Sequence, residues 1–153
     1  MLKEMCDAIL NKPSIMGRLA IGKLVGFVIG LIGFIALPFV WDGSTLMLQF
    51  AVLFWYTTIG AIIGVFGVLN YHPVLHLPMP WWFRAPLLGG WMNLVLTLFA
   101  YDLFQGMIAT MLGGSFAGMS PFWFVLEGAI IGFIIGGIAT KFAGEGPETV
   151  THQ

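Results

Sequence analysis

The sequence predicts an all-α integral membrane protein with four transmembrane helices. Apolar residues make up 59% of its 153 residues and charged residues only 8%, with a mean hydropathy of +0.96, whereas about a quarter of a soluble domain is charged. The chain also contains four long apolar runs, and about 20 apolar residues in a helix cross a bilayer about 30 Å thick. These runs lack the alternation of a β-barrel strand, so helices are the expected form.

The four apolar runs define a membrane domain over residues 17–142. We expect its spans at about residues 19–40, 46–69, 85–112 and 122–142. Residues 1–16 place Leu2, Met5, Cys6 and Ile9 at helical spacing before Pro13, which is typical of an amphipathic helix at the membrane surface. A frayed polar leader fits this short segment equally well. The tail, residues 143–153, is polar and is expected to be disordered.

The distribution of basic residues predicts the orientation. With four crossings, all six basic residues fall on one side of the bilayer: Lys3, Lys12, Arg18, Lys23, Arg84 and Lys141. The loops on the opposite side carry Asp42 and no basic residue. The positive-inside rule then places both termini in the cytoplasm. The short loops suit a multi-pass protein of a bacterial inner membrane.

Composition and motifs exclude several classes of function. The chain has too few basic residues for a nucleic-acid surface, and its single cysteine, Cys6, allows no internal disulfide framework. No nucleophilic triad, phosphate-binding glycine loop or dinucleotide fingerprint occurs. We therefore expect no cofactor and no catalytic residue, and an enzyme acting on lipid is a distant third choice.

An internal repeat suggests that the four helices form two parallel two-helix units. Residues 54–64 (FWYTTIGAIIG) match residues 122–132 (FWFVLEGAIIG) at an offset of 68, with seven of the eleven positions identical. The first and third spans match poorly at this offset, and Gly, Ala and Ile are common in membrane helices. Duplication and shared composition therefore both remain open. Two crossings restore the original side, so two copies would be parallel.

Glycines at four-residue spacing predict close helix packing. Small residues at this spacing let two helix backbones approach and gain dispersion contacts. The glycines concerned are Gly22, Gly26, Gly30, Gly60, Gly64, Gly128, Gly132 and Gly136. The pattern does not distinguish packing within one chain from packing between chains.

Two acidic residues within the spans are the main candidates for function. Asp102 lies ten residues before Leu112, about 15 Å along a straight helix and near the middle of the bilayer. Glu127 is shallower and replaces Ile59 of the first repeat. A carboxyl group in hydrocarbon is costly unless it is paired, protonated or beside water. Polar residues that could join such a network are Asn93, Gln105 and Gln49; a purely structural role for all of them is the alternative.

The loop at residues 70–84 predicts a membrane-surface anchor. Its three prolines oppose a long helix, and Trp81, Trp82 and Arg84 are residue types that gather at headgroup level. His72 and His76 are four residues apart, the spacing that on a helix would present two metal ligands. Two histidines without a further ligand are an incomplete zinc set, so we expect no metal and keep them as weak candidates.

These features support two functions of different classes. The first is a proton- or cation-conducting channel or transporter subunit, a homo-oligomer that uses the carboxyl groups within its spans. The alternative is a non-catalytic accessory or assembly subunit of a larger membrane complex, bound through its glycine faces and its tryptophan-rich loop. The specific ion, substrate or partner is not encoded in any motif of the sequence.

Overall fold

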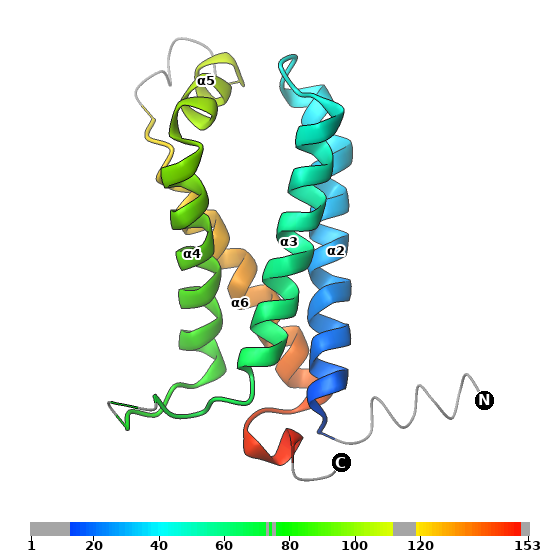
Figure 1. Cartoon of the computed structure of the whole chain (residues 1–153), viewed down its shortest axis with the longest axis vertical. Helices are drawn as coiled ribbons and strands as arrows, with labels where there is room; N and C mark the ends of the chain where they lie inside the picture. Colours follow the sequence, from blue (N-terminus) through cyan, green and yellow to red (C-terminus); the bar gives the residue numbers. More distant parts are fainter. Residues whose placement is uncertain (1–12, 73, 75, 112–118, 151–153) are drawn as a thin grey trace, which may run out of the picture.

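The protein is a bundle of long helices (Figure 1). The structure, a computed structural model, describes residues 13–72, 74, 76–111 and 119–150. The expected surface helix of the leader falls almost wholly on residues 1–12, outside the described residues. The elements in chain order are α2 (Ile15–Val40), α3 (Leu46–Phe66), α4 (Trp81–Phe99), α5 (Tyr101–Met111), α6 (Trp123–Ala143) and the short 3₁₀ helix η2 (Pro147–Thr149).

Side-chain caps explain where the first two helices begin. The Ser14 hydroxyl accepts a hydrogen bond from the Gly17 amide at 2.9 Å, and the Thr45 hydroxyl accepts one from the Leu48 amide at 3.2 Å. Each bond satisfies one of the amides that have no partner within the helix. Helix α2 consequently starts four residues earlier than the predicted span at residues 19–40.

Three of the helices are long and apolar enough to cross a membrane: α2, α3 and α6. A fourth span exists only if α4 and α5 are counted together, and these two helices meet at an angle of 91°. The predicted span at about residues 85–112 is therefore divided by a sharp bend into α4 and α5. The bend lies at Ala100, where no Pro or Gly marks it.

Aromatic contacts accompany the bend between α4 and α5. The Tyr101 ring lies 6.0 Å from the Phe122 ring and the Phe104 ring 4.4 Å from the Phe124 ring, measured between centroids. Helix α5 is amphipathic, with Met107 buried on its inner side. These ring contacts connect the first turn of α5 to the start of α6.

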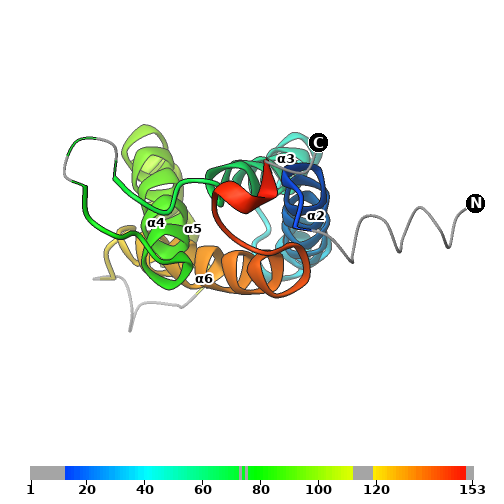
Figure 2. The same cartoon turned by 90° about the horizontal axis from the view of Figure 1, so that it is seen from below.

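The helices pair into two hairpins, α2 with α3 and α4 with α6 (Figure 1). Seen from below, α6 runs along one side of the bundle and also contacts α2 (Figure 2). All eight glycines of the predicted packing faces are buried. Gly22, Gly26, Gly30, Gly60 and Gly64 lie between α2 and α3, and Gly128, Gly132 and Gly136 face α4. These faces are used within the chain.

The two hairpins repeat the same backbone contacts. Gly22 lies against the Gly60 carbonyl, and Gly89 lies in the same way against the Gly128 carbonyl. The offset is 67 residues in the first helix of each hairpin and 68 in the second. Asn93 consequently takes the place that Gly26 has in the first hairpin. A single offset of 68 therefore aligns α3 with α6 but misaligns α2 with α4.

Two buried arginines, Arg18 and Arg84, connect helix ends on the side of the bundle where α2 begins and α6 ends. The Arg18 side chain donates to the Gly64 carbonyl at 3.2 Å, to the Thr140 hydroxyl at 3.3 Å and to the Gly144 carbonyl. The Arg84 side chain donates to the Gly67, Leu69 and Met79 carbonyls. Both guanidinium groups thus bind carbonyls at helix C-termini, where the helix dipole favours a cation.

Arg84 also holds the polar tail against the bundle. Its guanidinium forms an ion pair with the Glu145 carboxylate at 2.9 Å, and the Gly146 amide donates to the Gly67 carbonyl at 3.0 Å. Gly144 and Gly146 have positive φ angles, which glycine adopts without strain. The tail thereby turns back under α3. Residues 144–146 thus lie against the bundle, and the expected disorder of residues 143–153 stays a prediction; residues 151–153 lie outside the described residues.

Candidate functional site

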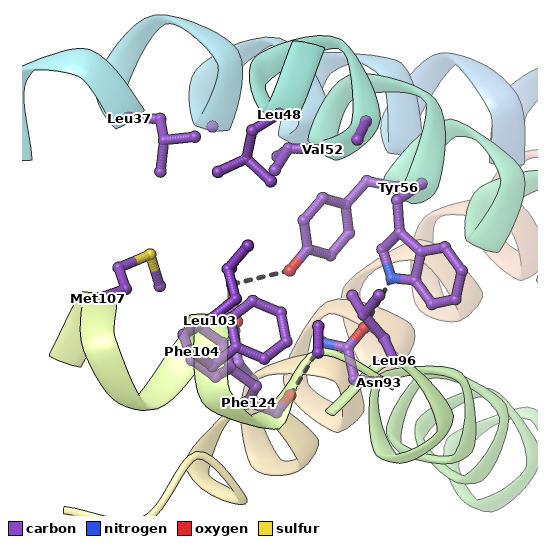
Figure 3. Close-up of a pocket in the computed structure, with 15 residues that line it drawn as sticks. Leu37, Leu48, Val52, Tyr56, Asn93, Leu96, Leu103, Phe104, Met107 and Phe124 are labelled. Atoms are coloured by element: carbon purple, nitrogen blue, oxygen red, sulfur yellow. Dashed lines mark hydrogen bonds between the residues drawn. The ribbon is translucent and has the colours of Figure 1, made fainter. Parts of the chain in front are cut away.

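A cavity of about 290 Å³ separates the two hairpins on the side of α5. All five long elements contribute to its wall: α2 and α3 on one side, and α4, α5 and α6 on the other (Figure 3). Most of its 15 lining residues are apolar, among them Leu37, Val52, Leu96, Leu103 and Met107. Helix α5 can form part of this wall because the bend at Ala100 carries it across the space between the hairpins.

Two hydrogen-bonded pairs form the polar part of the wall. The Tyr56 hydroxyl donates to the Glu127 carboxylate oxygen Oε1 at 3.0 Å. The Trp55 indole Nε1 donates to the Asn93 amide oxygen at 3.0 Å. In each pair an aromatic side chain of α3 crosses to a polar residue of the other hairpin. Among the described residues that line the cavity, Glu127 is the one charged residue.

The Asn93 side-chain amide holds three helices together. Besides accepting from Trp55, it donates from Nδ2 to the Phe124 carbonyl at 2.9 Å (Figure 3). Asn93 is 1% exposed, and the Thr97 hydroxyl one turn later donates to the Asn93 carbonyl at 2.7 Å. These bonds connect α3, α4 and α6 at one level. Asn93 therefore fixes the geometry around Glu127.

An apolar cluster closes the cavity toward the arginine end. Ile59 and Ile63 of α3, Ala85 of α4, and Ile131 and Ile135 of α6 are all buried and pack together. Each lies on the side of Trp55, Asn93 or Glu127 that faces the buried arginines. Glu127 itself is exposed, and these packed side chains separate its carboxyl group from the arginine end of the bundle.

The remaining predicted polar residues lie outside the cavity wall. Asp102 is exposed in the first turn of α5, where an acid interacts favourably with the helix dipole. Its predicted depth assumed a straight third helix, and the bend removes that assumption. Gln105 and Gln49 are half-buried and do not line the cavity. Of the five predicted polar residues, the structure thus brings Asn93 and Glu127 together.

The three residues of the predicted anchor lie in the first turn of α4 and not in a loop, and two of them, Trp81 and Arg84, pack against the protein. Trp82 is exposed, and Trp81 packs on Phe133 with ring centroids 5.1 Å apart. Arg84, expected at headgroup level, is instead buried, because helix C-terminal carbonyls and Glu145 surround its guanidinium.

The two histidines do not adopt the helical arrangement that would suit a metal. Residues 70–72 pair antiparallel with residues 77–79: the His72 amide donates to the Leu77 carbonyl at 2.9 Å, and the Met79 amide donates to the Asn70 carbonyl at 2.7 Å. His76 has a φ of 49°, outside the right-handed helical region. Among the described residues, no three His, Cys, Asp or Glu side chains gather where they could hold a metal ion.

Tyr56 and Trp55 are the site residues that the sequence analysis missed. The repeat could have revealed Tyr56, because Tyr56 stands where the second copy has Phe124, just as Glu127 stands where the first copy has Ile59. These two departures from the repeat hydrogen-bond to each other. Compared with protein-family models, with curated proteins and with solved structures, the chain matches none.

Proposed function

We propose that this chain is a small multi-pass membrane protein in which Glu127 carries a proton or a cation during transport. Its membrane location is supported by the outer surface of the bundle. Phe39, Met47 and Phe99 are 85%, 83% and 88% exposed, and many other large apolar side chains also face outward. Contiguous apolar surface of this kind indicates contact with lipid or with a partner.

The proposed orientation places the arginine end in the cytoplasm. Arg18, Arg84 and Lys141 lie at or near this end, which also carries the loop after α3 and the tail. The positive-inside rule favours the cytoplasmic side of a bacterial inner membrane for it. Helix α4, with 19 residues, is about 28 Å long. With α4 as the third crossing, α5 would lie along the opposite surface and carry Asp102 there.

The hydrogen bond between Tyr56 and Glu127 at the cavity wall is the observation that carries the transport proposal. A carboxylate in apolar surroundings is stabilised when it binds a proton or a cation, because either removes the uncompensated charge. The Tyr56 hydroxyl keeps the carboxyl group directed to the space between the hairpins. The apolar cluster beyond it excludes an open pore. A passing ion would therefore require the two hairpins to move relative to each other, as in alternating access.

Replacing Glu127 by Gln is expected to abolish transport. Purified protein in vesicles should move protons, or a cation driven by them, and the variant should lose this movement because its amide cannot exchange a proton or neutralise a cation. The measurement is internal pH, recorded with a fluorescent indicator after an imposed gradient.

Asp102→Asn provides the matched control, since it removes an acid that lies outside the cavity wall. We expect it to retain transport, although the sequence alone placed both acids on the path. Loss of transport in Asp102→Asn with full activity in Glu127→Gln would reverse the assignment. Equal silence of all proteins toward every ion tested would remove the transport proposal and favour the accessory role.

A homo-oligomer or a larger complex would have to form through other surfaces than those first expected. The predicted glycine faces are buried between helices of the same chain. We therefore propose that a second copy or a membrane partner would contact the apolar side chains on the outside of the bundle. The bilayer itself is the partner that these side chains suit most directly.

A further inference from the structure

We infer that the cavity between the two hairpins binds a hydrophobic organic ammonium ion, held by the Glu127 carboxylate and by the aromatic rings beside it. This inference rests on the proposed function and deepens it, because it names the class of cation that the same carboxyl group would accept. It is carried by the wall of the cavity, by the rings in that wall and by the number of oxygen atoms that it offers.

The wall suits a ligand with a large apolar part. A volume of about 290 Å³ is near the lower end of the range for small-molecule pockets, about 300–1,000 Å³. Leu37 of α2, Val52 of α3 and Leu103 and Met107 of α5 supply apolar surface from opposite sides (Figure 3). A small hydrated ion would leave this surface in contact with water, whereas an aromatic or alkyl group would cover it.

Four aromatic side chains lie in the same wall as the carboxylate. They are Trp55, Tyr56, Phe104 and Phe124, from three different helices. The faces of such rings attract ammonium groups, and aromatic side chains around a carboxylate are a common way to recognise alkylated amines. Tyr56 contributes both its ring and, through its hydroxyl, the hydrogen bond that positions Glu127. The charge of the site is thus complementary to an organic cation.

The site has too few oxygen atoms for a bare metal ion. Calcium takes six to eight oxygen ligands and magnesium about six. The described part of the wall offers four side-chain oxygen atoms: two of the Glu127 carboxylate, the Tyr56 hydroxyl and the Asn93 amide oxygen, which already accepts one hydrogen bond from Trp55. An alkylated ammonium carries its own apolar shell and needs no such coordination. The same cavity is therefore better suited to an organic cation than to a metal.

The test is equilibrium binding of benzyltrimethylammonium to the purified full-length protein in mild detergent. Quenching of tryptophan fluorescence, with Trp55 in the wall, provides the signal. We expect saturable binding of this cation, and no comparable binding of neopentylbenzene, the uncharged analogue of the same shape, or of benzenesulfonate. Glu127→Gln should weaken affinity by about tenfold or more, as loss of one partner of a charge pair does. Phe104→Leu should weaken it by about threefold through loss of one ring.

If a variant does not fold, the comparison of the cation with its neutral analogue on wild-type protein still decides the inference. Equal affinity for the cation and its neutral analogue, or no saturable binding of the cation, overturns it. Unchanged affinity in a folded Glu127→Gln variant does so as well. If the protein binds the cation but transports nothing in vesicles, the binding site stands and the proposed transport function falls. If the protein transports protons but binds no organic cation, the transport function stands and the binding site falls.

Discussion

Replacing Gly60 by Ala is expected to lower the free energy of unfolding by about 2–3 kcal/mol, the usual cost of adding atoms to a tightly packed position. A Cβ atom at residue 60 would overlap the Gly22 carbonyl and lie 3.2 Å from the Gly26 Cα. Both neighbours are backbone, so neither can rotate away as a flexible side chain could. Helices α2 and α3 would have to separate. The measurement is an unfolding titration in mixed detergent micelles, followed by circular dichroism.

Gly106→Ala is the matched control for the Gly60 variant. Both substitutions add the same atom to a helix, and at residue 106 that atom would meet nothing within 4 Å. The control should be neutral or more stable by up to about 1 kcal/mol, since Ala favours a helix over Gly. If the two variants shifted unfolding equally, close backbone packing at Gly60 would not be a source of stability.

Replacing Arg84 by Met is expected to cost about 3 kcal/mol and to release the tail. The substitution keeps much of the side-chain length but leaves the Glu145 carboxylate and the Gly67 and Leu69 carbonyls without their cation. Removing one partner of a buried ion pair usually costs about 3–5 kcal/mol, and Glu145 retains some contact with water. The same unfolding titration measures stability, and limited proteolysis followed by mass spectrometry measures release of residues 144–150.

Lys141→Met is the control for the loss of a positive charge at the same end of the bundle. Lys141 is exposed, with its ammonium 5.9 Å from the Phe142 ring centroid, so we expect a change within about 0.5 kcal/mol. The tail should stay resistant to protease in this variant. An Arg84→Met protein as stable and as resistant as the Lys141→Met protein would contradict a clamping role for Arg84.

The sequence predicts most of the helices because hydropathy and capping residues are local signals. Ser14 and Thr45 each stand immediately before a helix, and the long apolar runs identify α2, α3 and α6. The bend at Ala100 has no such signal, because no Pro or Gly occurs there and the ring contacts that accompany it join residues about 20 positions apart. The repeat of α2 in α4 was obscured by a one-residue change of offset, which only the Gly22 and Gly89 contacts reveal.

The candidate site was predicted in part, for a similar reason. Glu127 and Asn93 are visible as polar residues in apolar runs, and the structure places both in the cavity wall. Tyr56 and Trp55 were overlooked because aromatic residues are common in membrane helices, and their role depends on which residues α3 meets across the bundle. The predicted depth of Asp102 assumed a straight helix, and the bend before Tyr101 removes that assumption because a distance along the sequence equals a depth only while the helix continues straight.

Chemical labelling of Glu127 tests the central claim most directly, namely that this carboxyl group lies in an apolar cavity that accepts a cation. A hydrophobic carbodiimide modifies carboxylic acids in apolar surroundings, and mass spectrometry locates the product. The account predicts modification of Glu127 in the reconstituted protein and protection of Glu127 by benzyltrimethylammonium. Absence of modification at Glu127, or modification that a saturating concentration of the cation leaves unchanged, would contradict it.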